Sequence, residues 1–371
     1  MRTKLFKSLA VVGAIAFTAG VMGACSSGEK SIPTIDLIGN MNHEDVGDLD
    51  DIFEVVDVIS PELTDSTMLR RPHVCGFSNG KIYLSDEDYT SNRLMTFDVK
   101  TGKCLASFDH TGQGPGEYKF YYDAIFQGTP GYWTGLDTFY RRVTKYTADG
   151  ELIESWPEVP ILSLRPDGEG WIAVDNDLSR GHEDPIRLIR FDAKFNPTDT
   201  IETNLPDDPF AMPRLYSSPD GPQFFVQDTL YAFHDGKTPT PIFAFNTGHL
   251  KAPMNMTGIE AWKVRDKYLN YFFNRFGHYI LVDYMYDGKG LNQIFDIRNG
   301  ELAYSRSCRI DPETLKIIDG ETGLILTVDG EKSRWYFMNS VDDYVFLKQS
   351  AEDVDEETSN TKIIRLRPKD R

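Results

Sequence analysis

Gly170-Trp-Ile-Ala-Val-Asp175 is a short apolar run that starts at a glycine and ends at an aspartate, and the chain repeats its shape. Three clear copies are Gly80-Lys-Ile-Tyr-Leu-Ser-Asp86, Gly131-Tyr-Trp-Thr-Gly-Leu-Asp137 and Gly277-His-Tyr-Ile-Leu-Val-Asp283. Two weaker copies are DTLYAFH (228–234) and DYVFLK (343–348). Recurrence of one short unit along a chain indicates a repeat architecture.

Each run is followed by a second segment with the alternation of a β-strand. These segments are RLMTFD (93–98), RVTKYT (142–147), RLIRFD (187–192), PIFAFN (241–246), LNQIFD (291–296) and KIIRLR (362–367). Asp-Gly, Asn-Gly and Thr-Gly pairs mark hairpin turns between strands. Outer strands are predicted at 104–109, 151–156 and 301–306. Six strand pairs predict six blades.

The last pair ends almost at the C-terminus, so its blade has no outer strand of its own. The alternating segment DIFEVVDVI (51–59) precedes the first blade and would fill that place. Such a closure removes the exposed edges of an open sheet. The sequence therefore predicts an all-β fold, a six-bladed β-propeller over residues 51–371 closed by an N-terminal strand. A double-sheet sandwich is the alternative, but it gives no reason for six similar units.

The first 24 residues have the anatomy of a secretion signal, with basic Arg2, Lys4 and Lys7 before an apolar stretch at 9–22. Small residues then precede Cys25, which predicts a lipoprotein signal peptide at 1–24 and acylation of Cys25. Residues 25–50 are expected to be the lipidated N-terminus and a linker. Acyl chains would hold the protein to a membrane of the cell envelope, on the periplasmic or the surface side of the outer membrane.

The chain has 39 Lys and Arg against 57 Asp and Glu, and loss of the three basic signal residues leaves 36 against 57, a net charge of −21. Nucleic acid is therefore excluded as an expected partner, and cationic or neutral ligands are favoured. Three cysteines remain after Cys25. Because Cys75 is predicted on an inner strand and Cys104 on an outer strand of one blade, no disulfide is expected between them.

The segment HTGQGPGEYKFYYDAIFQG (110–128) connects the first two predicted blades. Its glycines Gly112, Gly114 and Gly116 allow a tight backbone path, and Tyr118 can pack between blades. This run resembles the blade-linking loops of NHL and TolB-like propellers. After a lipoprotein signal, it resembles the six-bladed propeller lipoproteins of Bacteroidota. The resemblance implies an envelope protein and adds no catalytic residues.

In such blades the loop after the second strand and the connection to the next blade emerge on one face, here called the loop face. Carboxylates, tyrosines and arginines on this face suit sugars or peptides. The predicted ligand-binding residues are Asp88, Tyr89, Tyr140, Arg141, Asp177, Arg180 and Tyr286. The repeated aspartates are instead expected to shape turns by accepting backbone N–H groups, although they are the candidates if a metal is bound. They are Asp86, Asp137, Asp175 and Asp283.

The favoured function is a non-catalytic binding or scaffold module for a glycan, a peptide or a partner protein, without a cofactor. The alternative is a metal-dependent hydrolase or lyase, lactonase-like, that uses a divalent cation such as calcium in the central channel. The histidines are scattered singly, and no nucleophile motif is present. These observations favour binding over catalysis.

Overall fold

The computed structural model divides the chain into two units, Met1–Ser31 and Ile32–Arg371. The structure describes parts of the second unit alone. The described ranges are 32–87, 92–128, 131–176, 184–206, 214–218, 221–233, 236–251, 267–311, 317–320, 323–350, 354 and 359–369. Cys25 and the signal peptide therefore lie outside the described residues.

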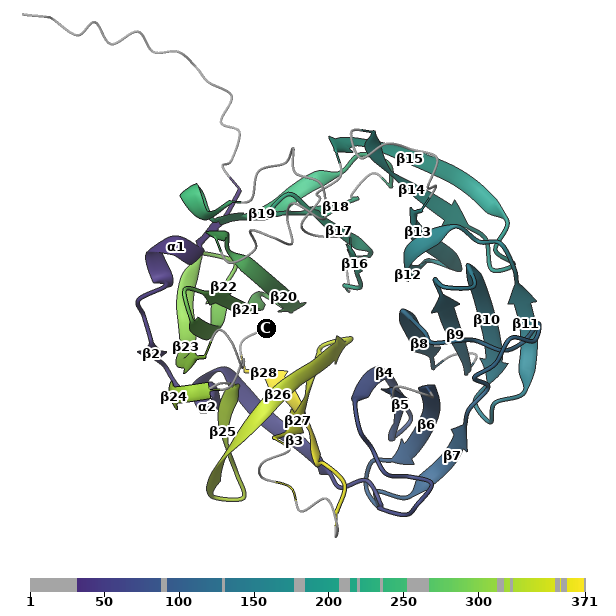
Figure 1. Cartoon of the computed structure of the whole chain (residues 1–371), viewed down its shortest axis with the longest axis horizontal. Helices are drawn as coiled ribbons and strands as arrows, with labels where there is room; N and C mark the ends of the chain where they lie inside the picture. The colour runs from purple at the N-terminus through teal and green to yellow at the C-terminus, as the bar shows by residue number, and fades with distance from the viewer. Residues whose placement is uncertain are drawn as a thin grey trace, which may run out of the picture. The chain divides into compact units, whose positions relative to one another are not determined.

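Six β-sheets form the blades of a β-propeller, which confirms the predicted fold (Figure 1). Blades I to III each have four strands in chain order. Blade I contains β4 (Pro72–Ser78), β5 (Lys81–Glu87), β6 (Asn92–Asp98) and β7 (Cys104–Phe108). Blade II contains β8 (Asp123–Gln127), β9 (Tyr132–Asp137), β10 (Arg142–Thr147) and β11 (Leu152–Trp156). Blade III contains β12 (Ile161–Asp167), β13 (Gly170–Asp175), β14 (Pro185–Phe191) and β15 (Pro197–Pro206).

Blades IV to VI combine chain-order strands with strands from the N-terminal segment. Blade IV contains β16 (Arg214–Tyr216), β17 (Gln223–Val226), β18 (Thr229–Ala232), β19 (Thr240–Asn246) and β1 (Thr34–Asp36). Blade V contains β20 (Asn270–Phe276), β21 (Tyr279–Tyr286), β22 (Lys289–Asp296), β23 (Glu301–Ile310), β24 (Ile317–Gly320) and β2 (Asp45–Val46). Blade VI contains β25 (Leu324–Val328), β26 (Glu331–Val341), β27 (Tyr344–Gln349), β28 (Ile363–Pro368) and β3 (Phe53–Ile59).

The N-terminal segment closes the ring. Strand β3 pairs antiparallel with β28, with Ile59 opposite Ile363, as the sequence predicts. Upstream of it, β1 pairs in parallel with β19, and β2 pairs with β23. Residues 32–50, which the sequence analysis assigns to a linker, thus supply edge strands to blades IV and V. Two short helices, α1 (Leu37–Asn40) and α2 (Leu49–Ile52), connect these strands, and a 3-10 turn η1 (Gly248–Leu250) follows β19.

The hydrophobic core consists of six clusters, and each cluster lies between two neighbouring blades. Strand β13 illustrates the arrangement, because Trp171 and Ala173 pack between blades II and III while Ile172 and Val174 pack between blades III and IV. Successive strand side chains point to opposite faces of a sheet. The sequence of the second strand of a blade is therefore a continuous apolar run, since both faces of that strand are buried.

The segment that links blades I and II packs as predicted. Tyr118 is fully buried in the cluster between these blades, together with Trp133. Cys75 and Cys104 lie on β4 and β7 as predicted, and both are free thiols. In the described ranges, none of the helices is long and apolar enough to span a bilayer.

Candidate functional site

Two of the repeated aspartates bind backbone N–H groups of neighbouring loops: Asp86 those of the segment before β4, and Asp137 those before β8 and after β9. Asp86 is buried and accepts hydrogen bonds from the backbone N–H groups of Arg70 (2.8 Å) and Arg71 (2.9 Å), and Arg93 Nη2 lies 2.6 Å from its second oxygen. Asp137 is fully buried. It accepts from three backbone N–H groups, which belong to Lys119 (2.6 Å), Phe139 (2.9 Å) and Tyr140 (3.0 Å). The bonds of Asp137 to Phe139 and Tyr140 are the turn-shaping use that the sequence predicts, whereas the bonds of Asp86 hold the segment that leads into its blade.

Asp175 ends β13 and has a different partner. Arg187 donates from Nε to Asp175 Oδ2 at 2.6 Å, across the hairpin between β13 and β14. The Asp175 side chain is almost completely buried by this ion pair. Asp86, Asp137 and Asp175, at or next to the ends of β5, β9 and β13, are thus engaged by their own blades and by the segments that lead into them.

Asp283 departs from the pattern, because strand β21 continues past it to Tyr286. The sequence places an aspartate at the end of each second strand, whereas Asp283 lies inside its strand. Its neighbour across the sheet is Asn292 on β22, which donates from its side-chain amide to Asp283 Oδ1. Asn292 is itself oriented by Gly323, whose N–H donates to Asn292 Oδ1 at 2.6 Å.

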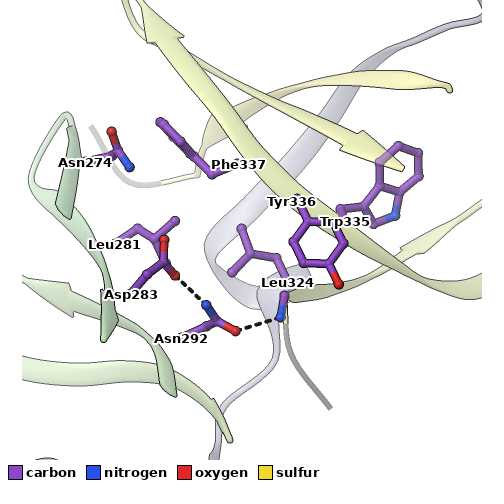
Figure 2. A pocket seen from close by; sticks show the side chains of 9 residues that line it. Asn274, Leu281, Asp283, Asn292, Leu324, Trp335, Tyr336 and Phe337 are labelled. Carbon is purple, nitrogen blue, oxygen red and sulfur yellow. Dashed lines mark hydrogen bonds between the residues drawn. The ribbon is translucent and has the colours of Figure 1, made fainter. Parts of the chain in front are cut away.

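A cavity of about 230 Å³ opens beside this pair, between blades V and VI (Figure 2). We call it the V–VI cavity. Its polar lining is Asp283, Asn274, Asn292 and Tyr336, and its other lining residues are Leu281, Gly323, Leu324, Trp335 and Phe337. In Figure 2 Asp283 and Asn292 come from the strands of blade V, and Leu324, Tyr336 and Phe337 face them from blade VI.

Burial raises the pKa of the Asp283 carboxyl from 3.8 to about 6, although the Asn292 hydrogen bond acts in the opposite direction. The shift is large because a desolvated carboxylate loses the hydration that stabilises its charge. A perturbed carboxyl in a cavity marks a candidate functional site.

Two exposed apolar side chains lie next to Asp283 on the same face of blade V. Phe272 on β20 is directly opposite Asp283 in the register, and its side chain is 56% exposed. Met285 lies two residues further along β21, towards the loop face, and is 48% exposed. Because residues two apart on a strand share a face, Phe272 and Met285 lie on the same face of blade V as the Asp283 carboxyl, and we call this exposed pair the apolar rim. The guanidinium carbon of Arg214 in blade IV lies 5.8 Å from the centroid of the Phe272 ring.

The structure separates the ligand-binding residues that the sequence predicts. Tyr140 and exposed Arg141 follow β9 in blade II, where the Tyr140 ring packs edge-on against Phe139 with centroids 5.2 Å apart. Tyr286 is in blade V, three blades away in ring order, and packs against the cluster between blades IV and V. It therefore lies on the opposite face of blade V from Asp283. Asp88, Tyr89, Asp177 and Arg180 lie outside the described residues.

Asn292 was not predicted as a site residue. A signal existed, since the residue of the third strand that lies across from the repeated aspartate is an arginine in blades I to III, namely Arg93, Arg142 and Arg187. In blade V the residue opposite Asp283 is the uncharged Asn292. Asp283 therefore lacks the arginine partner that Asp86 and Asp175 have.

The four metal candidates come from four different blades. Across the residues that the structure describes, no group of three or more His, Cys, Asp or Glu side chains could hold a metal ion. Asp283 has amide and apolar neighbours in the V–VI cavity rather than further carboxylates. The described geometry is therefore that of a cavity with a single acid.

A family model covers residues 32–369, which is nearly the whole described unit. The chain belongs to the DUF4934 family, a domain of unknown function. The match begins at the residue where the propeller unit begins, so the DUF4934 domain includes the edge strands β1 and β2.

Solved structures share the fold of this DUF4934 chain. A candidate exported protein of Bacteroides fragilis is 16% identical with a TM-score of 0.64, covering 91% of this chain and 100% of that one. A DUF4221 family member from Bacteroides vulgatus is 10% identical with a TM-score of 0.54, covering 86% of this chain and 98% of that one. The comparison with curated proteins gave no match.

Proposed function

We propose that this DUF4934 protein is a non-catalytic binding module of the cell envelope, and that its loop face binds a peptide segment of a partner protein. The observation that carries the proposal is the V–VI cavity with its apolar rim. A pocket with few polar groups and apolar walls is typical of a ligand site. Exposed apolar side chains beside such a pocket are typical of contact with another protein.

A peptide fits this site better than a glycan does. A sugar ring presents hydroxyl groups on most of its edges, and each buried hydroxyl needs a hydrogen-bond partner. The V–VI cavity offers few free partners, because Asn292 is already engaged by Asp283 and by the Gly323 N–H. The exposed Phe272 and Met285 instead match the alternating polar and apolar side chains of an extended peptide.

The envelope location rests on the signal peptide and on Cys25. Seven residues, 25–31, precede the propeller unit. A fully extended tether of that length reaches about 25 Å. An acylated Cys25 would therefore keep the propeller close to a bilayer, where a partner in the same membrane is encountered often. The fold shared with a candidate exported protein of Bacteroides fragilis supports export.

A display experiment tests the proposal. The mature chain carrying Cys25→Ser is screened against a random-peptide library and against a glycan array. We expect peptides to be selected, and we expect Phe272→Ser to weaken their binding at least tenfold. Phe139→Ser is the matched control, because Phe139 is 58% exposed and lies on the loop of blade II. Selection of glycans alone, or loss of binding through Phe139→Ser rather than Phe272→Ser, would overturn the proposal.

A further inference from the structure

The Asp283 carboxylate is positioned for one more contact. Asn292 occupies Oδ1, and in the described part of the chain no hydrogen bond is made to Oδ2. The Gly323 N–H fixes the orientation of Asn292, so the amide cannot turn its oxygen towards the carboxylate without losing that bond. The carboxylate is therefore held in place before any ligand arrives, which reduces the entropy lost on binding.

Among the described residues that line the V–VI cavity, none carries a positive charge. The lining residues Asn274, Asn292 and Tyr336 are polar without a positive charge, and the remaining walls are apolar. Arg334 also comes from β26 and its stem lies beside Gly323, but it is not among the residues that line the cavity. A buried carboxylate without a cation is costly, and a cationic ligand group would offset that cost.

On these observations, and resting on the proposed function, we propose that the V–VI cavity recognises a single lysine side chain of the bound peptide. A cavity of about 230 Å³ is smaller than the roughly 300–1,000 Å³ of pockets for drug-sized ligands, so it suits one side chain. The four-carbon stem of lysine would cross the apolar rim formed by Phe272 and Met285. The ammonium group would then reach Asp283.

The acceptors in the cavity match an ammonium group better than a guanidinium group. An ammonium has three donors that point in different directions, so one of them can reach the single open oxygen of Asp283, Oδ2, in a cavity that Asn274 and Tyr336 also line. Arginine prefers to bind both oxygens of a carboxylate with two parallel N–H groups. Asn292 already occupies one oxygen of Asp283, so this bidentate geometry is blocked.

The charge of the whole protein favours the same class of ligand. The mature chain carries a net charge of about −21, which raises the local concentration of cations and speeds their association. The rim adds apolar contact that a simple inorganic cation could not use. A lysine side chain combines both features.

Calorimetric titration of the mature chain carrying Cys25→Ser tests the pocket with defined probes. The probes are acetyl-Ala-Lys-Ala-amide, the same peptide with arginine or norleucine in place of lysine, and hexylammonium chloride as a free amine. We expect the lysine peptide and hexylammonium to bind at pH 7.5, and the arginine and norleucine peptides to bind at least tenfold more weakly. Because only ionised Asp283 attracts the ammonium, affinity at pH 5 should fall roughly tenfold.

Asp283→Asn should weaken both amine probes at least tenfold. Asp287→Asn is the matched control, since Asp287 is exposed in the turn after β21 and its substitution removes the same charge. Three outcomes would each overturn the lysine pocket. The lysine and norleucine peptides could bind equally, Asp283→Asn could leave binding unchanged, or hexylammonium could bind while the lysine peptide does not. The display screen tests peptide binding independently of the lysine pocket. If the selected peptides need Phe272 but contain no required lysine, the proposed function stands and the lysine pocket is wrong.

Discussion

The hydroxyl of Tyr118 donates a 2.7 Å hydrogen bond to the backbone carbonyl of Asn92 and so joins the linker of blade II to a strand of blade I. The same hydroxyl accepts from the His110 N–H at 3.2 Å. Both bonds are shielded from water because Tyr118 is fully buried. The contact shows how the linking loop holds two neighbouring blades in register.

Removal of this hydroxyl should destabilise the propeller. Tyr118→Phe leaves the Asn92 carbonyl without its donor, and we expect the free energy of unfolding to fall by about 1–3 kcal/mol. Urea unfolding followed by tryptophan fluorescence measures the change. Tyr140→Phe is the control, because Tyr140 is only partly buried, and it should change stability by no more than about 0.5 kcal/mol. Equal effects of the two variants would contradict this role of Tyr118.

Ring closure depends on the buried face of β3. Ile59 is fully buried in the cluster between blades VI and I, so Ile59→Ala should cost about 2–5 kcal/mol through lost burial and a cavity. Val55 is on the same strand and 39% exposed, so Val55→Ala should cost much less. Thermal unfolding compares the two. A similar loss for both would mean that strand pairing rather than packing holds β3.

We expect Asp137 to contribute to the stability of the fold rather than to ligand binding. Asp137→Ala leaves three backbone N–H groups, those of Lys119, Phe139 and Tyr140, without their acceptor, and we expect a loss of at least about 2 kcal/mol. Asp149→Ala, at an exposed turn, is the control. Chemical unfolding reports the difference. A stable Asp137→Ala variant that loses ligand binding would instead assign Asp137 to the ligand.

The raised pKa of Asp283 makes stability depend on pH. Between about pH 4 and pH 6 the folded protein keeps a proton that the unfolded chain releases, because the folded pKa is about 6 and the ordinary value is 3.8. Stability of the wild type therefore falls as pH rises through this window. Asp283→Asn cannot ionise, so we expect it to be about 1–3 kcal/mol more stable than the wild type at pH 8 and equal to it below pH 4. Unfolding curves at both pH values, with Asp287→Asn as the control, decide the matter.

Acylation of Cys25 should determine where the protein resides. Cys25→Ser is expected to move the protein from the membrane fraction to the soluble fraction, because several acyl chains are needed for stable anchoring. Cys75→Ser keeps the anchor and should stay with the membrane. Fractionation and the mass of the N-terminal peptide check the outcome. An unmodified Cys25 in the mature protein would contradict the lipoprotein assignment.

The sequence alone determined the six blades and their closure. Both faces of a second strand such as Gly170–Asp175 are buried, so its apolar run repeats visibly along the chain. Segment 53–59 could be assigned to the last blade for two reasons that are visible in the sequence. The segment alternates like a strand, and the last strand pair ends near the C-terminus without an outer strand. Tyr118 could be placed between blades for a similar reason, since a large aromatic residue among glycines has no other apolar surface nearby.

Only the tertiary structure decided the candidate site. In sequence Asp283 ends a run like that of Asp86, but strand β21 continues beyond it and places its carboxyl inside the sheet. Its partner Asn292, the Gly323 N–H and the wall residue Tyr336 come from three further segments. Strand length and the facing of neighbouring blades are set by packing between distant residues, and a local pattern of residue types carries no information about that packing.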